Sequence, residues 1–424
     1  MKKFLALIIA LVMALSLVAC GEQKQPETPD VPDDGGDQQQ TATIKVGFIT
    51  LHDENSTYDL NFINAAKEAI ANLGLTENDY ILKTNVPEGQ ECYDAAAELA
   101  DAGCNIIFAD SFGHEPYMIQ AAKDFPNVQF CHPTGTRAHT EGLSNYHNAF
   151  ASIYEGRYLA GIAAGLKLNE MIEAGQFTAD QAKMGYVGAF TYAEVVSGYT
   201  SFYLGAKSVC PTVTMDVTFT GSWYDETLEK EGAQKLIAGG CKLISQHADS
   251  LGAPTACENA GIPNVSYNGS TITAGPNTYI ISSRIDWAPY YEMAIKAVMD
   301  GTEIPADYTG NLSTGSVVLT DLNTAVAAEG TQAAIDAAKA KLESGELHVF
   351  DCSTFTVSGA NVKDTMKVDA DGHLTSYMAD VNTDEAYTGD TEVVHDGYFS
   401  ESEFRSAPYF DLFIDGINTL DTAF

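Results

Sequence analysis

Basic residues are scarce in this sequence. Its 424 residues contain 22 lysines and arginines against 58 aspartates and glutamates, which gives a formal net charge of −36 at pH 7. A surface of this sign repels polyphosphates, so we expect no nucleic-acid partner. It also disfavours a strongly anionic small ligand unless local cations compensate. Solubility is the simplest use of so many carboxylates.

Cysteine pairs at metal-ligand spacing are missing as well. After Cys20 there are seven cysteines and no CxxC, an odd set that fits neither a disulfide framework nor a zinc site. We expect Cys104 and Cys241, each at the start of a strand, to be small buried side chains. The seven are Cys92, Cys104, Cys131, Cys210, Cys241, Cys257 and Cys352.

Catalytic signatures are absent too. The sequence contains no GxSxG elbow, HExxH, P-loop or GxGxxG fingerprint at a strand–helix turn. His132 and His139 lie seven residues apart in a Gly/Thr-rich stretch without a carboxylate constellation, so we expect no metal site there. We therefore predict a protein without cofactor or metal that is not an enzyme.

Long apolar runs are limited to the first twenty residues. Lys2 and Lys3 precede about 15 apolar residues, too few for a comfortable membrane span, which is typical of a secretory signal peptide. The run ends in Leu-Val-Ala-Cys, which resembles a bacterial lipobox and implies that Cys20 carries lipid and begins the mature chain. The alternative is an ordinary secretion signal that ends in cysteine. Removing Lys2 and Lys3 changes the formal charge from −36 to −38.

Residues 21–43 favour a flexible tether. GEQKQPETPDVPDDGGDQQQ has three prolines, and six acidic residues against one lysine, with no apolar periodicity. Such a segment cannot bury enough surface to offset the entropy of ordering it. A lipid anchor and a tether would place the folded part just outside a membrane without spanning it.

From Thr43 onward, apolar strand-like runs alternate with helical segments. IKVGFIT, NIIFAD and VQFCH are apolar throughout, which is typical of parallel strands covered on both faces. The alternation restarts after residue 149 with the helical segment SIYEGRYLAGIAAGLKL, and KMGYVGAFT, from residue 183, is a strand like IKVGFIT. We predict an α/β protein of two Rossmann-like lobes with parallel sheets and a ligand cleft between them.

The predicted boundaries follow that restart. Hinge strands near Asn148, Ile281 and Leu312 would let the lobes close. The predicted parts are a lipoprotein signal peptide (1–20), a disordered tether (21–43), lobe 1 (44–148 plus 285–312) and lobe 2 (149–284 plus 313–424, including a C-terminal extension).

One phrase occurs in both series. AGCNIIFADSFG begins at residue 102 and GGCKLISQHADSLG at residue 239, and each runs from Gly-Cys through an apolar strand to Ala-Asp-Ser. Asp110 and Asp249 therefore stand at the ends of corresponding strands. Because ligands bind beyond the carboxyl ends of parallel strands, we expect both aspartates at one shared cleft.

Aromatic, acidic and hydroxyl side chains follow several other predicted strands. Aromatic faces stack on flat rings, and carboxylates or amides bond hydroxyl and amine groups. Both tryptophans of the chain are among these residues. The candidate ligand contacts are Tyr58, Asp59, Asp110, Ser111, Phe112, Tyr192, Trp223, Asp249, Asn268 and Trp287.

Some of these candidates have structural alternatives. Asp110 and Asp249 can serve as caps of the helices that follow them. Trp287 shares a helical spacing with Tyr290 and Tyr291 that also fits a core stripe. Arg284 can pair with Asp286.

Several segments together resemble a known family. IKVGFIT, STYDLN, ADAGCNIIFADSFG, YEGRYLAGIAAG, GSWYDETLEKEGAQKLIAGGCKLISQHA and IISSRIDWAPYYEMAIKAVMDG are similar to the basic membrane lipoproteins, the substrate-binding lipoproteins of ABC importers that include purine nucleoside receptors. The resemblance covers roughly residues 40–320. It implies a type I periplasmic-binding fold and a purine ring clamped between aromatics of facing lobes.

The resemblance also implies roles for single residues. Tyr58 and Asp59 stand where the family carries its first-loop aromatic and polar neighbour, and Asp110 with Phe112 would face the ligand. Trp223 lies in GSWYD, where the family carries a GSF-type turn.

Two departures concern the sugar of a nucleoside. Tyr267 and Asn268 stand where nucleoside-binding members carry an acidic turn, and Ser283 stands where they carry a lysine. The resemblance implies that this acidic turn and this lysine hold the ribose hydroxyls. The segment from Trp287 to Tyr291 looks closer to members that take free bases. The choice between base and nucleoside therefore stays open.

The sequence thus predicts a monomeric binding protein on the extracytoplasmic face of the cell membrane, lipid-anchored at Cys20, that delivers a purine base or nucleoside to an ABC permease. One alternative is a receptor for another small neutral ligand, such as a sugar or autoinducer. Another is a surface sensor that passes its ligand-bound state to a signalling partner. An enzyme on the same scaffold is disfavoured by the missing motifs.

Overall fold

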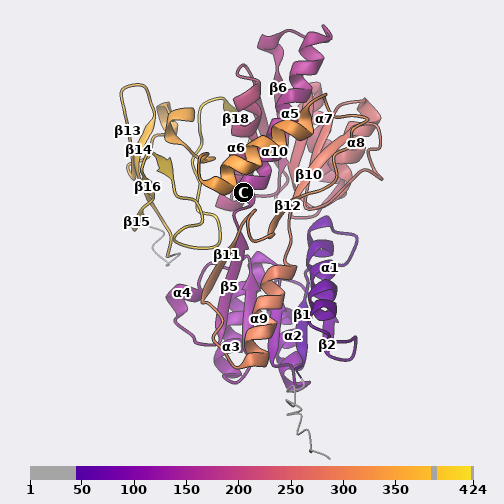
Figure 1. The fold of residues 1–424 in the computed structure, drawn as a ribbon, viewed down its shortest axis with the longest axis vertical. Coiled ribbons are helices and arrows are strands. Elements are labelled where there is room, and N and C mark those ends of the chain that lie inside the picture. Colours follow the sequence, from indigo (N-terminus) through magenta and orange to yellow (C-terminus); the bar gives the residue numbers. More distant parts are fainter. Residues whose placement is uncertain (1–43, 383–388, 422–424) are drawn as a thin grey trace, which may run out of the picture. The chain divides into compact units, whose positions relative to one another are not determined.

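Two sheets organise the chain in the computed structural model, which describes residues 44–382 and 389–421 (Figure 1). Residues Ala42–Phe424 form one compact unit. We call the six-stranded sheet with its helices lobe 1, and the seven-stranded sheet with its helices lobe 2.

The sheet of lobe 1 is parallel throughout, in the order β11-β5-β4-β3-β1-β2. Its central strands are wholly buried because helices cover both faces, as their unbroken apolar sequences predict. The strands are β1 (Val46–Ile49), β2 (Tyr80–Lys83), β3 (Ile106–Ala109), β4 (Gln129–Pro133), β5 (Tyr146–Ala151) and β11 (Asp307–Gly310).

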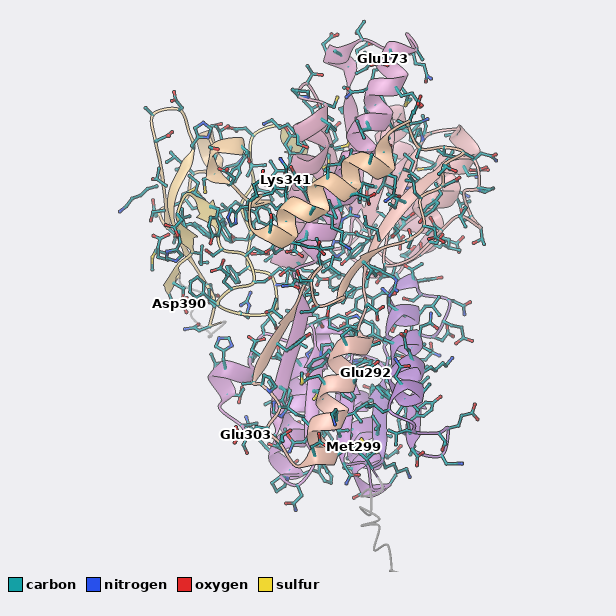
Figure 2. All side chains as sticks on the ribbon, in the orientation of Figure 1. Glu173, Glu292, Met299, Glu303, Lys341 and Asp390 are labelled. Atoms are coloured by element: carbon teal, nitrogen blue, oxygen red, sulfur yellow. The ribbon has the colours of Figure 1, made fainter. Side chains whose placement is uncertain are left out.

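The helices of lobe 1 include one that comes from far along the chain. This is α9, which carries Glu292 (Figure 2) and packs beside α1. The Asn72 side chain of α1 donates to the Glu292 carboxylate at 2.7 Å. The helices are α1 (Thr57–Asn72), α2 (Gln90–Asp101), α3 (Glu115–Asp124), the short α4 (Ala138–Glu141) and α9 (Ala288–Asp300), with a 3-10 turn at Phe112–His114.

The sheet of lobe 2 has the order β12-β10-β9-β8-β6-β7-β18, and β12 is antiparallel to β10. Its strands are β6 (Lys183–Gly188), β7 (Thr214–Phe219), β8 (Leu243–His247), β9 (Asn264–Tyr267), β10 (Tyr279–Ile285), β12 (Val317–Leu319) and β18 (Ile417–Thr419). Its helices are α5 (Ile153–Glu173), α6 (Ala193–Val209), α7 (Glu226–Ala238), α8 (Gly252–Ala260) and α10 (Thr331–Ser344), with a 3-10 turn at Ala179–Gln181.

Glycines bring α5 and α6 into backbone contact. A Cβ on Gly161 would collide with the carbonyl of Phe202, and one on Gly205 with the carbonyl of Tyr158. The absence of these side chains lets the two helices pack closely inside lobe 2.

The two sheets repeat one strand order, β2-β1-β3-β4-β5 in lobe 1 and β7-β6-β8-β9-β10 in lobe 2. The predicted fold of two parallel-sheet lobes is therefore confirmed. The repeated sequence phrases form β3 and β8, which hold the same place in the two sheets. In each sheet the strand order reverses beside this strand, where ligands of open α/β sheets bind.

The chain passes between the lobes at three places. These passages lie between β5 and α5, between β10 and α9, and between β11 and β12. Three separate segments therefore connect the two sheets. The residue boundaries of the lobes given in the sequence analysis stay a prediction.

The C-terminal segment beyond α10 is built from short elements. They are β13 (Met366–Val368), β14 (Leu374–Ala379), β15 (Thr391–Glu392), β16 (Val394–His395), β17 (Tyr398–Phe399) and 3-10 turns at Cys352–Thr354 and Gly359–Asn361. The Asp369 carboxylate accepts the backbone amides of Asp371 and His373, which makes VDADGHL a hairpin turn between β13 and β14.

Two details of the expected core are confirmed. All seven described cysteines are free and buried, including Cys104 and Cys241. Arg284 pairs with Asp286 at 3.1 Å, as the sequence suggests.

Candidate functional site

Loops after β1, β3 and β4 of lobe 1 meet loops after β6, β7, β8 and β9 of lobe 2 around one cavity, which we call the slot. The slot has a volume of about 20 Å³, little more than one water molecule needs. In this conformation the facing side chains nearly meet. The lining residues are Leu51, His52, Tyr58, Asp59, Ser111, Phe112, Thr134, Glu194, Trp223, His247, Asp249 and Asn268.

Aromatic rings from both lobes surround the slot. Phe112 of lobe 1 and Tyr192 of lobe 2 approach to 5.3 Å between ring centroids, and both are more than one-third exposed. Trp223 lies 6.0 Å from Tyr192 and 5.0 Å from Phe190. Exposed faces of this kind stack on planar ligands.

Asp59 is the ionised carboxylate of the site. It is fully buried in the first turn of α1, where it accepts from the His52 amide at 2.8 Å and the Ser56 hydroxyl at 2.6 Å. The His52 ring lies 3.2 Å from its second oxygen. Burial raises the pKa of Asp59, but the hydrogen bonds from His52 and Ser56 outweigh it and leave the pKa lowered.

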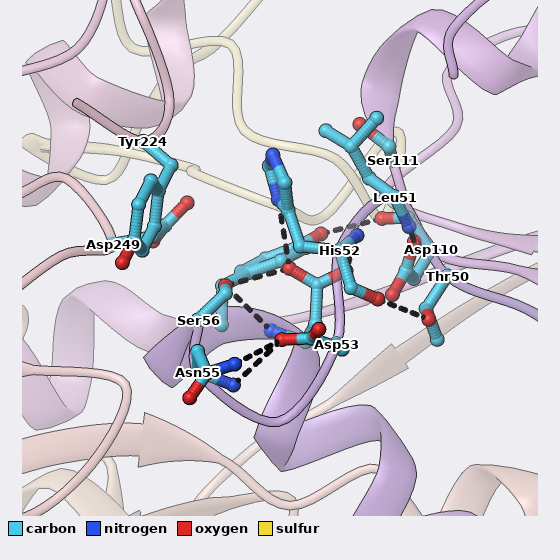
Figure 3. Close-up of polar contacts among 12 residues, drawn as sticks. Thr50, Leu51, His52, Asp53, Asn55, Ser56, Asp110, Ser111, Tyr224 and Asp249 are labelled. Atoms are coloured by element: carbon cyan, nitrogen blue, oxygen red, sulfur yellow. Dashed lines mark hydrogen bonds and ion pairs between the residues drawn. The ribbon is translucent and has the colours of Figure 1, made fainter. Parts of the chain in front are cut away.

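The pKa values of Asp110 and Asp249 are shifted in the opposite direction from that of Asp59. Burial, followed by the charge of Asp59, raises the pKa of each well above its ordinary value. Asp110 accepts from the Leu51 amide at 3.1 Å (Figure 3), and Asp249 accepts from the Asn268 side chain at 3.3 Å. A neutral carboxyl both donates and accepts, which suits the alternating donors and acceptors of a heteroaromatic edge.

Neither aspartate caps a helix. The 3-10 turn after β3 is capped by Ser111, and α8 begins after Leu251. The capping alternative for Asp110 and Asp249 is therefore wrong, because both side chains lie against the slot loops instead.

A buried histidine lies on the lobe 2 side of the slot. His247 Nε2 lies 3.4 Å from Glu194 Oε1, and burial lowers the pKa of its ring, which keeps it neutral. Behind it, Tyr267 packs on His247 and under the guanidinium of Arg157. Tyr267 therefore supports the wall from within lobe 2.

The lobes bond to each other at the slot. The backbone amide and the hydroxyl of Thr57 both donate to the Asp249 carbonyl at 3.1 Å. The rings of His52 and Tyr224 also face one another across the lobes at 5.5 Å (Figure 3). Asn268 takes a left-handed conformation, φ 64°, which turns its amide toward Asp249.

Most of the residues expected from the sequence gather here. Asp110 lies directly behind the slot, and its carbonyl accepts from the Tyr58 hydroxyl at 2.6 Å. Tyr192 lines an adjoining compartment. The candidates that line the slot itself are Tyr58, Asp59, Ser111, Phe112, Trp223, Asp249 and Asn268.

Two expected residues fall elsewhere. Trp287 is 2% exposed and stacks on Phe62 at 4.7 Å, so its place is the core of lobe 1. Cys20 lies outside the described residues. The sequence pattern did not single out His52, Glu194 or His247, although His52 follows β1 and His247 ends β8.

The described residues show no arrangement for a metal or for membrane crossing. Within 44–382 and 389–421, no group of three or more His, Cys, Asp or Glu is placed to hold a metal ion. None of the helices in those ranges has both the length and the apolar character that a membrane span requires.

The fold and the slot define a two-lobed solute-binding protein of the type I periplasmic class. Residues 47–349 match the family of PnrA-like ABC transporter substrate-binding proteins (Bmp), and the chain belongs to that family.

Individual relatives agree with this assignment. A purine-binding protein of Brucella abortus is 32% identical over 319 residues, which cover 74% of this chain and 85% of that protein. A Haloferax volcanii protein named as an ABC transporter glucose-binding protein is 31% identical over 258 residues, 61% of this chain and 62% of that one. A solved ABC transporter solute-binding protein of Aeropyrum pernix shares the fold, with a TM-score of 0.60 at 18% identity, over 76% of this chain and 95% of that one.

Proposed function

We propose that this protein binds a purine base or purine nucleoside between its two lobes and delivers it to an ABC permease. The observation that carries the proposal is the composition of the slot. Phe112 and Trp223 line the slot from different lobes, and the carboxyls of Asp249 in the slot and Asp110 behind it have pKa values that burial raises, whereas the pKa of Asp59 is lowered. A purine offers a flat ring to stack and ring nitrogens to bond with such carboxyls.

Closure follows from the shared site. A ligand in the slot touches both lobes only when they are together, so it binds the closed form better and shifts the population toward it. The three passages between the lobes would then act as hinges. The permease would recognise the closed pair of lobes, and binding without chemical change completes the role.

The proposal includes the membrane anchor. The Leu-Val-Ala-Cys sequence supports lipid on Cys20, which would hold the protein as a monomer at the extracytoplasmic face of the cell membrane. Fatty-acid labelling of the expressed chain tests this: the wild type incorporates label and Cys20→Ala does not. Equal labelling of both would contradict the anchor.

A sugar is the second candidate ligand, because the Haloferax volcanii relative is named for glucose binding and aromatic rings with carboxylates also suit sugars. Titration calorimetry of the mature protein separates the two. We expect saturable heat from adenine, hypoxanthine, adenosine or guanosine, with a dissociation constant of about 10 µM or below. No heat from any purine would contradict the purine assignment, and heat from glucose alone would establish the second candidate.

A further inference from the structure

The C-terminal segment lies beyond the part of the chain that matches the family, which ends at residue 349. It is fastened to lobe 2 by β18, which extends the sheet next to β7. The Asp421 carboxylate accepts from the Thr218 hydroxyl at 2.6 Å and the Phe219 amide at 2.8 Å. The segment is therefore a fixed part of lobe 2.

The same segment also contacts the sheet of lobe 1. The Ser406 amide donates to the Asp307 carboxylate at 3.1 Å, and the Thr309 hydroxyl donates to the Ser402 carbonyl at 3.3 Å. Asp307 and Thr309 belong to β11, the edge strand of that sheet. Residues 400–411 thus span the two lobes beside the slot.

This arrangement forms one side of an open compartment next to the slot. Its volume is about 500 Å³, within the range of small-molecule sites. Phe112, Thr134 and Glu194 line both spaces, so the compartment and the slot adjoin. The ring pair of Phe112 and Tyr192 stands at their boundary.

The C-terminal segment supplies one wall of the compartment, and the two lobes supply the rest. From the segment come Asp380, Arg405, Ala407, Pro408, Tyr409 and Asp411.

Charges of both signs line the compartment. Arg137 and Arg405 are two of the four arginines in the chain, and they face Glu194, Glu115 and Asp411. With acids outnumbering bases around it, the compartment disfavours an anion. Guanidinium donors beside carboxylate acceptors suit a group that offers several hydroxyls.

Existing bonds hold this lining in place. The Glu115 carboxylate accepts the amides of Thr136 and Arg137, at 2.8 and 2.9 Å. Arg405 donates to the carbonyls of Ala407, Val381 and Pro408 at 2.8–3.0 Å. The compartment is thus built by hydrogen bonds that do not depend on a ligand.

We propose that the compartment walled by Asp380 and by residues 405–411 binds an uncharged, hydroxyl-bearing saturated ring, a pentose or hexose, either attached to a flat ring in the slot or free. Aromatic faces of Phe112 and Tyr192 pack on its C–H surface, while Arg137 and Glu194 bond its hydroxyls. The C-terminal segment then sets specificity for the part of the ligand outside the slot. Only the flat ring in the slot rests on the proposed function, and the binding of the saturated ring in the compartment does not.

The test fills the compartment without touching the slot. Ala193 opens α6, is half-buried, and lines the compartment but not the slot. Calorimetry compares adenine, adenosine, ribose and glucose on wild type and Ala193→Phe. We expect adenosine, or a free sugar, to bind at least about tenfold more weakly to the variant, with adenine changed by less than about twofold.

Two further variants make the result specific. Ala333→Phe places the same ring on an exposed position of α10 and should change no affinity. Arg137→Gln removes the guanidinium without filling space, and among the described residues the guanidinium of Arg137 pairs only with Glu141. It should weaken adenosine or the sugar at least about threefold and spare adenine.

The outcomes separate this inference from the purine assignment. Equal effects of Ala193→Phe on adenine and adenosine, or no effect on either, overturn the compartment while purine binding stands. A free sugar that binds and is weakened by Ala193→Phe, with no purine bound, supports the compartment and overturns the purine assignment. No binding of any of the four compounds overturns both.

Discussion

The backbone amide and the hydroxyl of Thr57 both donate to the carbonyl oxygen of Asp249, each at 3.1 Å. Thr57 opens α1 in lobe 1, and Asp249 follows β8 in lobe 2. One of the amides that a helix N-terminus leaves unpaired is thereby satisfied by the opposite lobe. This contact connects the closure of the lobes to the loop that carries a candidate ligand residue.

Removing the Thr57 hydroxyl should weaken ligand binding. Thr57→Val keeps the branched shape and the backbone amide but loses one bond between the lobes. A net hydrogen bond contributes about 0.5–1.5 kcal/mol, so the ligand's dissociation constant should rise about two- to tenfold in calorimetry. Thr212→Val is the matched control, because its exposed hydroxyl donates to Ala179 within lobe 2. Equal losses in both variants would contradict a role in closure.

The two tryptophans should report the site differently. Trp223 lines the slot, whereas Trp287 is buried against Phe62 in lobe 1. Ligand addition should quench or shift the fluorescence of the wild type and of Trp287→Phe, and leave that of Trp223→Phe unchanged. Loss of the response in Trp287→Phe alone would place the ligand elsewhere.

Asp59 and Asp110 should respond unequally to the same substitution. Asp59→Asn puts an amide group where ionised oxygens accept from His52 and Ser56, and should cost about 1–3 kcal/mol of unfolding free energy. Asp110→Asn keeps an uncharged group with an oxygen for the Leu51 amide, and should cost less than about 1 kcal/mol. Urea unfolding measures both, and a reversed order would contradict the assigned charges.

The stability of the protein should fall as pH rises from 6.5 to 8. Burial raises the pKa of Glu401 from 4.5 to about 8, so in this window the folded chain still holds a proton that the unfolded chain has already released. Burial lowers the pKa of His114 and His147 to about 4, which acts in the opposite direction but only below about pH 6.5.

Thermal unfolding of wild type and Glu401→Gln tests this expectation. The melting temperature of the wild type should decrease from pH 6.5 to 8, and the variant should show a smaller decrease because it has no proton to release. Parallel curves for the two proteins would contradict the raised pKa of Glu401.

The sheet architecture was predictable because unbroken apolar strands and the repeated Ala-Asp-Ser phrase are local signals. The phrase located β3 and β8, and with them Asp110 and Asp249. The C-terminal segment gave no such signal, because strands of two or three residues such as β15 and β18 have no readable period. Helix α10 also begins at Thr331, later than the alanine-rich pattern from residue 324 indicates.

Side-chain direction limited the prediction of the site. Trp287 follows a strand of lobe 2 in sequence, yet the chain has by then returned to lobe 1, where the ring packs in the core. Glu194 reaches the slot from the first turn of α6, two residues beyond the candidate Tyr192. Sequence position fixes which loops converge, and tertiary packing decides which side chains of each loop face inward.

A crystal structure of the protein grown with saturating adenosine is the most direct test of purine binding between the lobes. We expect a purine ring held in the slot by both lobes, between Phe112 and Trp223, with Asp110 or Asp249 at its edge. A purine bound outside the slot, or a slot without purine at saturating adenosine, would contradict it.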